Sequence, residues 1–358
     1  MASAPKSASG RMALLRGWAF GLALLAAGCV ATYQGPPPGD HYTDGRFRNI
    51  GSFVEPVATA NDWADHAHQM LNGLFPDAYD LPENHVLPPD QVRAGLERAA
   101  NASLAVTWIG HATTLIRIGG QWVLTDPVFM HTVGAGPLRV LRHAPAAPGI
   151  DELPPIDVIV ISHADHDHLD IPSLRRLANR HPNAAVYVPL GVGNLVRLSG
   201  FRNVTEMDWY ETRHHDDLAI EAVPAIHGVR RPPYVGDSML WAGWILRDNS
   251  DAVYFAGDTG FGSIFEEMRR RSGAVDVALV PIGAWSPRWF QAPFHVDPDE
   301  AAEIARIMGA PTAIGIHWGT FPLSEEAPTE QKSRFLAAGG RGVEAIVPKV
   351  GETFVLKH

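Results

Sequence analysis

The sequence predicts an α/β protein in which β-sheets form the interior and helices cover them. Short β-rich runs begin at Leu104, and each is closed by a Gly, Pro or Asp turn residue. Further along the chain, similar runs alternate with stretches of helical spacing. Hydrophobic residues make up 46% of the 358 residues and charged residues 19%, so the chain can bury a sizeable core, as one large domain or two small ones.

The predicted helices and strands follow one another without an internal repeat. Residues 89–100 favour a helix. Asp170 is a typical N-cap for a helix over residues 171–180, and Asp297 caps a third helix, with Pro at N1 and Glu at N3. The predicted strands lie within residues 104–109, 113–118, 122–126, 157–162, 185–188, 218–223, 239–246, 252–257, 277–282 and 312–316.

The N-terminus has the pattern of a secretory signal. Lys6, Arg11 and Arg16 precede the apolar stretch 17–28, which is too short to span a bilayer and ends at Cys29, the only cysteine. The small residues directly before Cys29 resemble a bacterial lipoprotein cleavage box, with Ala at a position where Leu is more usual. The sequence therefore predicts a lipoprotein anchored at Cys29 in a bacterial cell envelope, on its periplasmic face or outer membrane. A plain signal peptide or an uncleaved anchor is the alternative.

The charge and the cysteine count limit the partners and the metal ligands. Removal of residues 1–28 takes three positive charges from a formal net charge of −10 and leaves −13, which argues against nucleic acid as a partner. A chain whose Cys29 is lipidated has no free thiol. Any metal site must then use His, Asp and Glu.

The residues that suggest chemistry follow predicted strands. Because rigid strands position the loops at their ends, several strand ends can deliver these side chains to one sheet edge. Two divalent metals with an open position need about this many imidazole and carboxylate ligands. The candidates are His163, Asp165, Asp167 and His168 after one strand, and His227, Asp258 and His317 after three later ones.

The motifs "VTWIGHATTLI", "VLTDPVF", "ISHADHDHLD", "VPAIHG", "FAGDTGF", "PIGAWSPRWF", "HVDPDEA" and "IHWGTF" follow one another between Leu104 and Phe321. In this order the chain resembles the metallo-β-lactamase superfamily, and within it the N-acylphosphatidylethanolamine-hydrolysing phospholipases D. The resemblance implies a four-layer αββα sandwich with a dizinc site at one edge of the sheets.

The resemblance also implies a role for each candidate residue. His163, Asp165 and His227 would form the first metal site. Asp167, His168 and His317 would form the second, and Asp258 would bridge the two. Asp167 and His295 are the expected catalytic residues, with His295 binding the phosphate or donating a proton. Trp285, Trp289 and Phe290 would contact an acyl chain or headgroup; ordinary core packing is the alternative for these three.

Asp165 departs from the family pattern, which has His at this position. A carboxylate can bind zinc at roughly 2.0–2.2 Å. It is shorter than imidazole and carries a charge, so the first site would favour Mn, Fe or Mg more than a histidine site does. Three arrangements remain open: Asp165 is a ligand, His166 reaches in to replace it, or the first site is weak or empty.

The activity implied by the resemblance is that of a metal-dependent phosphodiesterase of phospholipase D type. Its substrate would be an N-acylphosphatidylethanolamine-like phospholipid at a membrane surface, attacked by a hydroxide between two divalent metals, zinc by resemblance and Mn or Fe as the alternatives. A lactonase or other ester hydrolase on the same site is the second hypothesis, and a metal-impaired envelope lipoprotein with a binding role is the third. Nothing indicates an oligomeric state. The expected domains are 1–28, the signal peptide; 29–100, a tether and N-terminal extension; and 101–358, the hydrolase domain.

Overall fold

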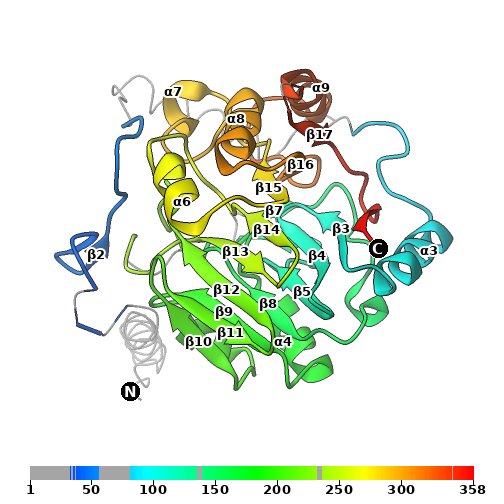
Figure 1. The fold of residues 1–358 in the computed structure, drawn as a ribbon, viewed down its shortest axis with the longest axis horizontal. Coiled ribbons are helices and arrows are strands. Elements are labelled where there is room, and N and C mark those ends of the chain that lie inside the picture. The colour runs from blue at the N-terminus through cyan, green and yellow to red at the C-terminus, as the bar shows by residue number, and fades with distance from the viewer. Residues whose placement is uncertain are drawn as a thin grey trace, which may run out of the picture.

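A computed structural model describes residues 33, 35–36, 38–55, 81–134, 139–231, 236–340 and 342–358. Two seven-stranded sheets face each other in the middle of the molecule, and helices cover their outer faces (Figure 1). The layers therefore run helix, sheet, sheet, helix. The α/β class with interior sheets, predicted from the sequence, is confirmed.

The first sheet combines an antiparallel meander with a parallel extension. Strands β3, β4 and β5 pair antiparallel in succession, β8, β9 and β10 continue the sheet in parallel, and β18 pairs antiparallel with β3 at the other edge. In sheet order the strands are β10 (Val204–Met207), β9 (Ala185–Pro189), β8 (Val158–Val160), β5 (Gln121–Thr125), β4 (Thr113–Ile118), β3 (Leu104–Gly110) and β18 (Thr353–Lys357).

The second sheet is built in the same way from later residues. Its first four strands are antiparallel, and its last four run parallel to one another. In sheet order they are β11 (Thr212–His215), β12 (Leu218–Val223), β13 (Gly243–Arg247), β14 (Ala252–Phe255), β15 (Val277–Pro281), β16 (Thr312–Ile316) and β17 (Glu344–Ile346).

Helices lie against both sheets. On the first sheet α3 contacts β3 and β18, and α5 contacts β10 and α4; on the second, α8 contacts β15, β16, α6 and α9. The predicted capping box of α8 is present, with Asp297 accepting the backbone N–H groups of Asp299 and Glu300. The helices are α3 (Pro89–Ala100), α4 (Ile171–Arg180), α5 (Gly193–Leu198), α6 (Ile264–Ser272), α7 (Arg288–Gln291), α8 (Pro298–Met308), α9 (Pro328–Ala338) and a 3₁₀ turn at Ile150–Glu152.

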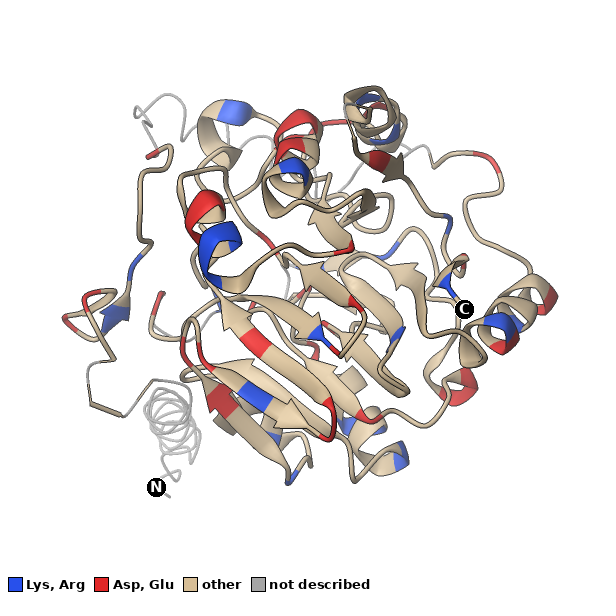
Figure 2. Cartoon of the chain, viewed as in Figure 1, with Lys and Arg blue, Asp and Glu red and all other residues tan. Residues whose placement is uncertain are grey.

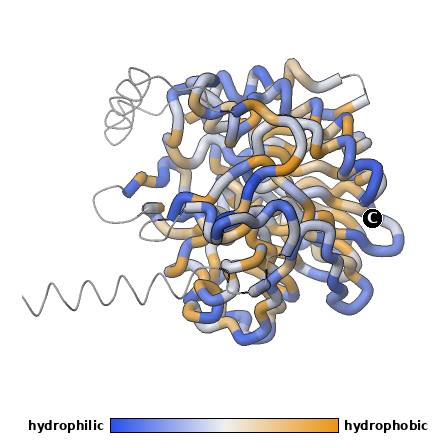
Figure 3. The backbone as a smooth tube through the Cα atoms, turned by 90° about the vertical axis from the view of Figure 1, so that its left-hand side faces the viewer, coloured by the Kyte–Doolittle hydropathy of each residue, from blue (hydrophilic) through white to orange (hydrophobic). Residues whose placement is uncertain are grey.

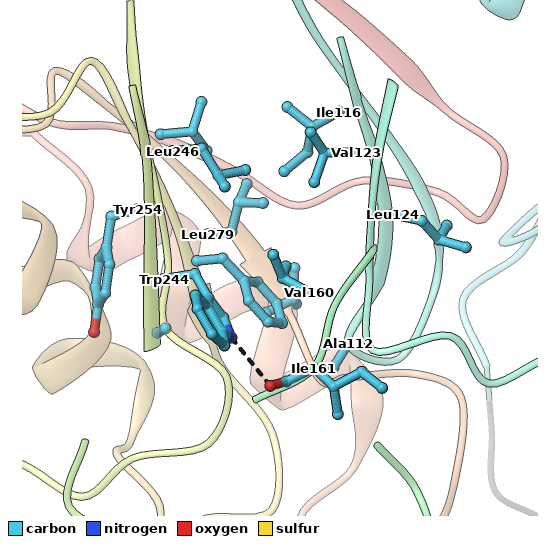
Figure 4. Packing of buried hydrophobic residues seen from close by; sticks show 14 of the residues in the cluster. Ala112, Ile116, Val123, Leu124, Val160, Ile161, Trp244, Leu246, Tyr254 and Leu279 are labelled. Atoms are coloured by element: carbon cyan, nitrogen blue, oxygen red, sulfur yellow. Dashed lines mark hydrogen bonds between the residues drawn. The ribbon is translucent and has the colours of Figure 1, made fainter. Parts of the chain in front are cut away.

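The core lies between the two sheets. Leu246 and Leu279 of the second sheet face Ile116 and Val123 of the first (Figure 4). The fully buried Trp244 crosses the interface and donates its Nε1–H to the carbonyl of Ile161 at 3.1 Å (Figure 4). This bond joins the second sheet to the chain just before the cluster of histidines and aspartates at 163–168.

One strand prediction is wrong in its extent. The sequence predicts one strand over residues 239–246, but β13 begins only at Gly243. The backbone N–H of Leu240 instead bonds to Leu190, and that of Ala242 bonds to Ser162, so residues 239–242 are tied to the first sheet. Residues 239–242 are apolar because they are buried between the two sheets. Their composition therefore resembles that of a strand, although they pair with no strand. Each of the other predicted runs contains a strand.

Two parts of the expected N-terminal extension pack onto the folded body. A small hairpin of β1 (Tyr42–Thr43) and β2 (Arg46–Phe47) buries Phe47 in the core. Farther on, His85 is buried, and Val86 forms a β-bridge with Val350 just before α3.

A second small hairpin, β6 (Thr132–Val133) with β7 (Val140–Leu141), follows β5. Cys29 and residues 1–28 lie outside the described residues.

The surface carries both signs of charge. Each of the helices α3, α6, α8 and α9 carries both acidic and basic residues (Figure 2). The hydropathy pattern agrees with this layering, because apolar segments run through the interior and hydrophilic ones occupy outer turns (Figure 3). Within the described parts of the chain, no helix has the length and apolar character needed to cross a bilayer.

Candidate metal centre

Strand direction explains why the candidate residues meet. In the first sheet β3, β5 and β8 run in the same direction, and in the second sheet so do β12, β14, β15 and β16. The carboxyl ends of such strands lie at one edge of a sheet, where sites of α/β proteins are commonly built. This edge carries His111 after β3, Asp126 after β5, residues 163–168 after β8, His227 after β12, Asp258 after β14 and His317 after β16.

Four side chains surround what we term the second metal position: Asp167, His168, Asp258 and His317. Asp258 Oδ2 lies 3.0 Å from His168 Nε2 and 3.2 Å from His317 Nε2. Asp167 Oδ2 lies 3.5 Å and 3.6 Å from the same two nitrogens. Ligands at about 2.0–2.1 Å from a tetrahedral zinc ion are roughly 3.3–3.4 Å from one another. The spacing of these atoms therefore fits a small divalent cation.

The first metal position, surrounded by His163, Asp165, His227 and Asp258, is wider. Asp165 Oδ2 lies 3.8 Å from His163 Nε2 and 3.9 Å from His227 Nε2. Asp258 Oδ2 lies 4.0 Å from His163 Nε2, so this carboxylate stands between the two positions. Ligating atoms of His163, His227 and Asp258 form one of the compact groups found among the described residues, whereas Asp165 and His166 belong to none of those groups.

The buried polar atoms at these positions require a partner. Buried nitrogen and oxygen atoms are almost always hydrogen-bonded, so a cluster of exceptions calls for an ion or a ligand. A divalent cation at each position would bind these atoms through their lone pairs. Within the described part of the chain, the atoms that lack a hydrogen-bond partner include Nε2 of His163, His168, His227 and His317, and Oδ1 of Asp258.

Asp126 and Ser162 orient two of the imidazoles. Asp126 Oδ2 accepts from His168 Nδ1 at 2.7 Å and from the Ser162 hydroxyl at 2.5 Å. The Ser162 oxygen is in turn 2.9 Å from His163 Nδ1, which donates to it. Because both Nδ1 atoms carry the proton, both Nε2 atoms present lone pairs to the metal positions.

His227 is held by segments that are distant in the sequence. Its Nδ1 donates to the Phe294 carbonyl at 3.1 Å, which leaves Nε2 as the free acceptor. Asn49, in the N-terminal extension, bonds both to the backbone N–H of His227 at 3.0 Å and to its carbonyl at 2.9 Å. Nothing in the aperiodic sequence around Asn49 indicates this contact.

The segment that follows His227 holds the loop that carries Asp165. The backbone N–H of Arg230 donates to Asp165 Oδ1 at 2.6 Å, so Oδ2 is the oxygen left to face His163 and His227. The buried guanidinium of Arg231 donates to the carbonyls of Ala164 at 2.7 Å and Leu169 at 2.9 Å, on either side of the loop. These contacts fix the shorter carboxylate in an orientation suited to a single-oxygen ligand.

Burial and mutual charge together set the pKa values of the cluster. Burial and the charge of Asp167 raise the pKa of Asp165 to about 7. Burial alone would raise the pKa of Asp167, but the charge on His168 and the hydrogen bond from His111 hold it well below its usual value. Burial opposes charging of His317, yet Asp258 and Asp167 raise its pKa to about 9. In the absence of a cation, the carboxylates therefore favour protons on His168 and His317.

Three residues of the edge have left-handed backbones. The φ angles of His111, Asp126 and His317 are 56°, 32° and 59°. Such angles are uncommon outside glycine, although His and Asp adopt them more readily than most residues, and they concentrate at functional sites. His111 and Asp126 lie outside the set of site residues predicted from the sequence. His111 directly follows β3 and Asp126 directly follows β5. This position at a strand end is the feature of the sequence from which both could have been predicted as site residues.

His295 lies beside both metal positions. Its Nδ1 is 3.8 Å from Asp258 Oδ2, and its ring centroid is 5.4 Å from that of His227 and 5.5 Å from that of His317. Arg288 donates to the His295 carbonyl at 2.8 Å and so fixes the loop before α8. The imidazole is only partly buried, which leaves it available to a ligand in front of the cluster.

The three predicted aromatic contacts differ in their surroundings. Trp285 is buried, and the guanidinium of Arg334 from α9 lies 4.5 Å from its ring centroid. Trp289 and Phe290 are half-buried on α7, with ring centroids 5.7 Å apart in an edge-to-face arrangement. Trp285 thus packs against Arg334, while Trp289 and Phe290 keep part of their surface open to solvent.

Comparisons with known proteins agree with this architecture. A family model described as a β-lactamase superfamily domain matches residues 121–318. N-acyl-phosphatidylethanolamine-hydrolyzing phospholipase D 1 of Caenorhabditis elegans is 36% identical over 63% of this chain. The mitochondrial protein of that activity name from Saccharomyces cerevisiae is 32% identical over 69% of this chain. The matched regions span 66% and 55% of these two relatives.

A solved structure shows the same fold at lower identity. The metallo hydrolase Igni18 of the archaeon Ignicoccus hospitalis superposes with a TM-score of 0.54 and 21% identity, over 71% of this chain and 99% of the archaeal one. At this identity the likeness concerns the fold alone. The family model, in contrast, covers more than half of the 358 residues. The chain therefore belongs to the β-lactamase superfamily and has the fold of its metallohydrolases.

Proposed function

We propose that this protein is a metal-dependent phosphodiesterase of phospholipase D type that hydrolyses N-acylphosphatidylethanolamine-like lipids. The observation that carries the proposal is the pair of adjoining His and Asp clusters that share Asp258, the arrangement a two-metal hydrolase needs. Identity of 36% and 32% to proteins named for this activity supports the choice of substrate class.

The residues divide the work of hydrolysis among them. Two divalent cations bound there would polarise the phosphate oxygens and lower the pKa of a water molecule to about 7, which would provide a nucleophile at neutral pH. His163, Asp165 and His227 would hold the first cation, Asp167, His168 and His317 would hold the second, and Asp258 would contribute to both. His295 binds the phosphate or donates a proton to the leaving alkoxide, since its partly exposed imidazole lies beside Asp258.

A lipid substrate would explain the partly exposed aromatic residues on α7. Trp289 and Phe290 on α7 lie a few residues before His295 in the chain, and an acyl chain or headgroup would contact their open surface. Trp285 contributes by packing beneath Arg334. A surface with both signs of charge and a negative net charge of −10 agrees with a small-molecule or lipid substrate rather than nucleic acid.

We further propose a location in the cell envelope. Cys29 lies outside the described residues, but the signal-like segment before it and the Pro/Gly-rich stretch after it have the pattern of a lipid anchor with a tether. An anchored enzyme stays close to bilayer phospholipids and needs only a short reach to bind them. Residues 1–28 would be removed, and residues 101–358 would carry the hydrolase activity.

The first prediction concerns the reaction. Purified protein loaded with Zn²⁺ or Mn²⁺ releases N-acylethanolamine from N-acylphosphatidylethanolamine, and removal of the metal with a chelator stops the release. Asp258→Ala abolishes this turnover because both positions lose a shared ligand. Asp276→Ala is the control and keeps full activity, since this half-exposed aspartate pairs with Lys357 at the opposite end of β15 from the cluster. Mass spectrometry of the products measures both.

A panel of substrates decides between the proposed reaction and its rivals. If the protein hydrolyses lactones or phosphomonoesters in preference to the phospholipid, the lipid substrate is wrong and the protein is a different hydrolase. Full phospholipid turnover by Asp258→Ala would contradict the shared-ligand role.

The second prediction concerns the metal preference. Asp165→His replaces a charged oxygen ligand with a longer, neutral nitrogen ligand, so the variant takes up more Zn²⁺ relative to Mn²⁺ than the wild type does. Apo protein is dialysed against an equimolar mixture of the two ions, and elemental analysis gives the bound ratio. Asp151→His, at an exposed ion pair with Arg176, is the matched control. An unchanged ratio in Asp165→His would mean that Asp165 is not a ligand.

The third prediction concerns the anchor. Cys29→Ala cannot accept a lipid, so the protein moves from the membrane fraction to the soluble fraction when bacterial cells are lysed and fractionated. The catalytic residues are untouched, and the specific activity of the variant on detergent-dispersed substrate stays at the wild-type level. Retention of Cys29→Ala in the membrane fraction would exclude lipidation as the anchor.

A further inference from the structure

We propose that His111 is a positioning residue of the second metal position, where it holds Asp167 with its side chain and His317 with its backbone. The proposal rests on the metal-binding part of the proposed function and does not depend on the identity of the substrate. His111 is 1% exposed and lies in the turn between β3 and β4. Its potential ligand atom falls in one compact group with those of Asp167, His168 and His317.

The side-chain contact identifies His111 as a hydrogen-bond donor. Its Nε2 lies 3.0 Å from Asp167 Oδ2, the oxygen that faces His168 and His317. A carboxylate only accepts hydrogen bonds, so the proton of this bond must reside on Nε2 of His111. A nitrogen that carries a proton has no lone pair for a metal. His111 therefore aims the carboxylate of Asp167 instead of joining it as a ligand.

The backbone of His111 fixes the other side of the same position. Its carbonyl accepts the backbone N–H of His317 at 2.9 Å and the Trp108 indole N–H at 2.8 Å. Its own N–H donates to the Thr320 hydroxyl at 2.9 Å. The rings of His111 and His317 lie with centroids 3.9 Å apart. One residue thus links the loop at 163–168 in the first sheet to the loop after β16 in the second.

Tightly packed side chains behind this link hold the loop after β16 in place. Trp108 and Trp318 stack with ring centroids 5.4 Å apart, almost parallel. Gly319 has a φ of 54°, and a side chain there would collide with His85, which itself bonds to the Gly319 carbonyl at 2.8 Å. The loop that carries His317 therefore has little room to relax if the contacts from His111 are lost.

The proposal has a consequence for the two metal positions. At the second position, which His111 supports, the oxygens of Asp167 and Asp258 lie 3.0–3.6 Å from the nitrogens of His168 and His317. At the first position, Asp165 Oδ2 lies 3.8 Å from His163 Nε2 and 3.9 Å from His227 Nε2, and Asp258 Oδ2 lies 4.0 Å from His163 Nε2. A site with ligands held at the distances of the bound state needs less reorganisation to bind a cation. We therefore expect the second position to bind its cation more tightly than the first.

Two amides of different length test the role of the side chain. The glutamine side chain in His111→Gln extends about as far as Nε2 of histidine and can donate to Asp167, whereas the amide in His111→Asn is too short. Both replacements face the same left-handed backbone at φ 56°, and Asn tolerates it well. Loss of a hydrogen-bond partner of a metal ligand costs roughly 10–100-fold in metal affinity.

The measurement is a Zn²⁺ titration of apo protein against a competing chromophoric chelator, with far-ultraviolet circular dichroism as the check on folding. His111→Asn is expected to bind the tighter of its two cations roughly 10–100-fold more weakly than wild type, and His111→Gln to recover most of that loss. The matched control is His181→Asn. His181 is a buried histidine at the end of α4, and its Nδ1 accepts the backbone N–H of Ile156. This substitution is expected to change the affinity for neither cation.

Either of two results would overturn the proposal: wild-type affinity in His111→Asn, or an equal loss in His111→Gln and His111→Asn. The second result would mean that the imidazole itself is needed, as a ligand or as packing. If the wild-type protein binds cations but does not cleave the phospholipid, the proposed function is wrong and the proposal for His111 still stands. A wild-type protein that binds no cation would refute both.

Discussion

Three carboxylates, of Asp165, Asp167 and Asp258, converge at one buried edge of the two sheets. Two unit charges 4 Å apart near a protein surface repel by about 4 kcal/mol, so such a group is stable only with positive charge among its members. Without a cation, protons on His168 and His317 meet this need, which is why their pKa values are raised. A divalent cation does so more effectively, and its binding releases those protons.

The surrounding structure is arranged to hold this repelling group in place. Asp126 and Ser162 turn the Nε2 atoms of His163 and His168 inward, and the Arg231 guanidinium closes the loop between them by bonding to its carbonyls. His111 and the Trp108–Trp318 stack do the same for the loops of the second position. Because these contacts come from both sheets, the site forms only when the whole sandwich has folded.

The sequence predicts the parts of this design that depend on local pattern. Apolar runs indicate the interior strands, and the capping residues Asp170 and Asp297 indicate the starts of α4 and α8. The candidate ligands follow strands, and strand direction brings them together as expected. The outermost strands β10, β11, β17 and β18 escape prediction because they lie at sheet edges, and none of them has the fully buried run that marks the interior strands.

Contacts between distant segments are not encoded in any local pattern. Asn49 lies 178 residues from His227, and His111 lies 56 residues from Asp167, so only the folded chain reveals that they touch. Asp165 is intermediate: the sequence shows that a carboxylate replaces the family histidine, and the structure adds the Arg230 N–H that orients it.

Crystal diffraction at the absorption edge of the bound metal tests the two-metal arrangement most directly. Protein crystallised with Mn²⁺ or Zn²⁺ should show two anomalous peaks, one among His163, Asp165 and His227 and one among Asp167, His168 and His317, with Asp258 in contact with both. A single peak, or a second peak that Asp258 does not touch, would contradict a shared site at this edge of the sheets.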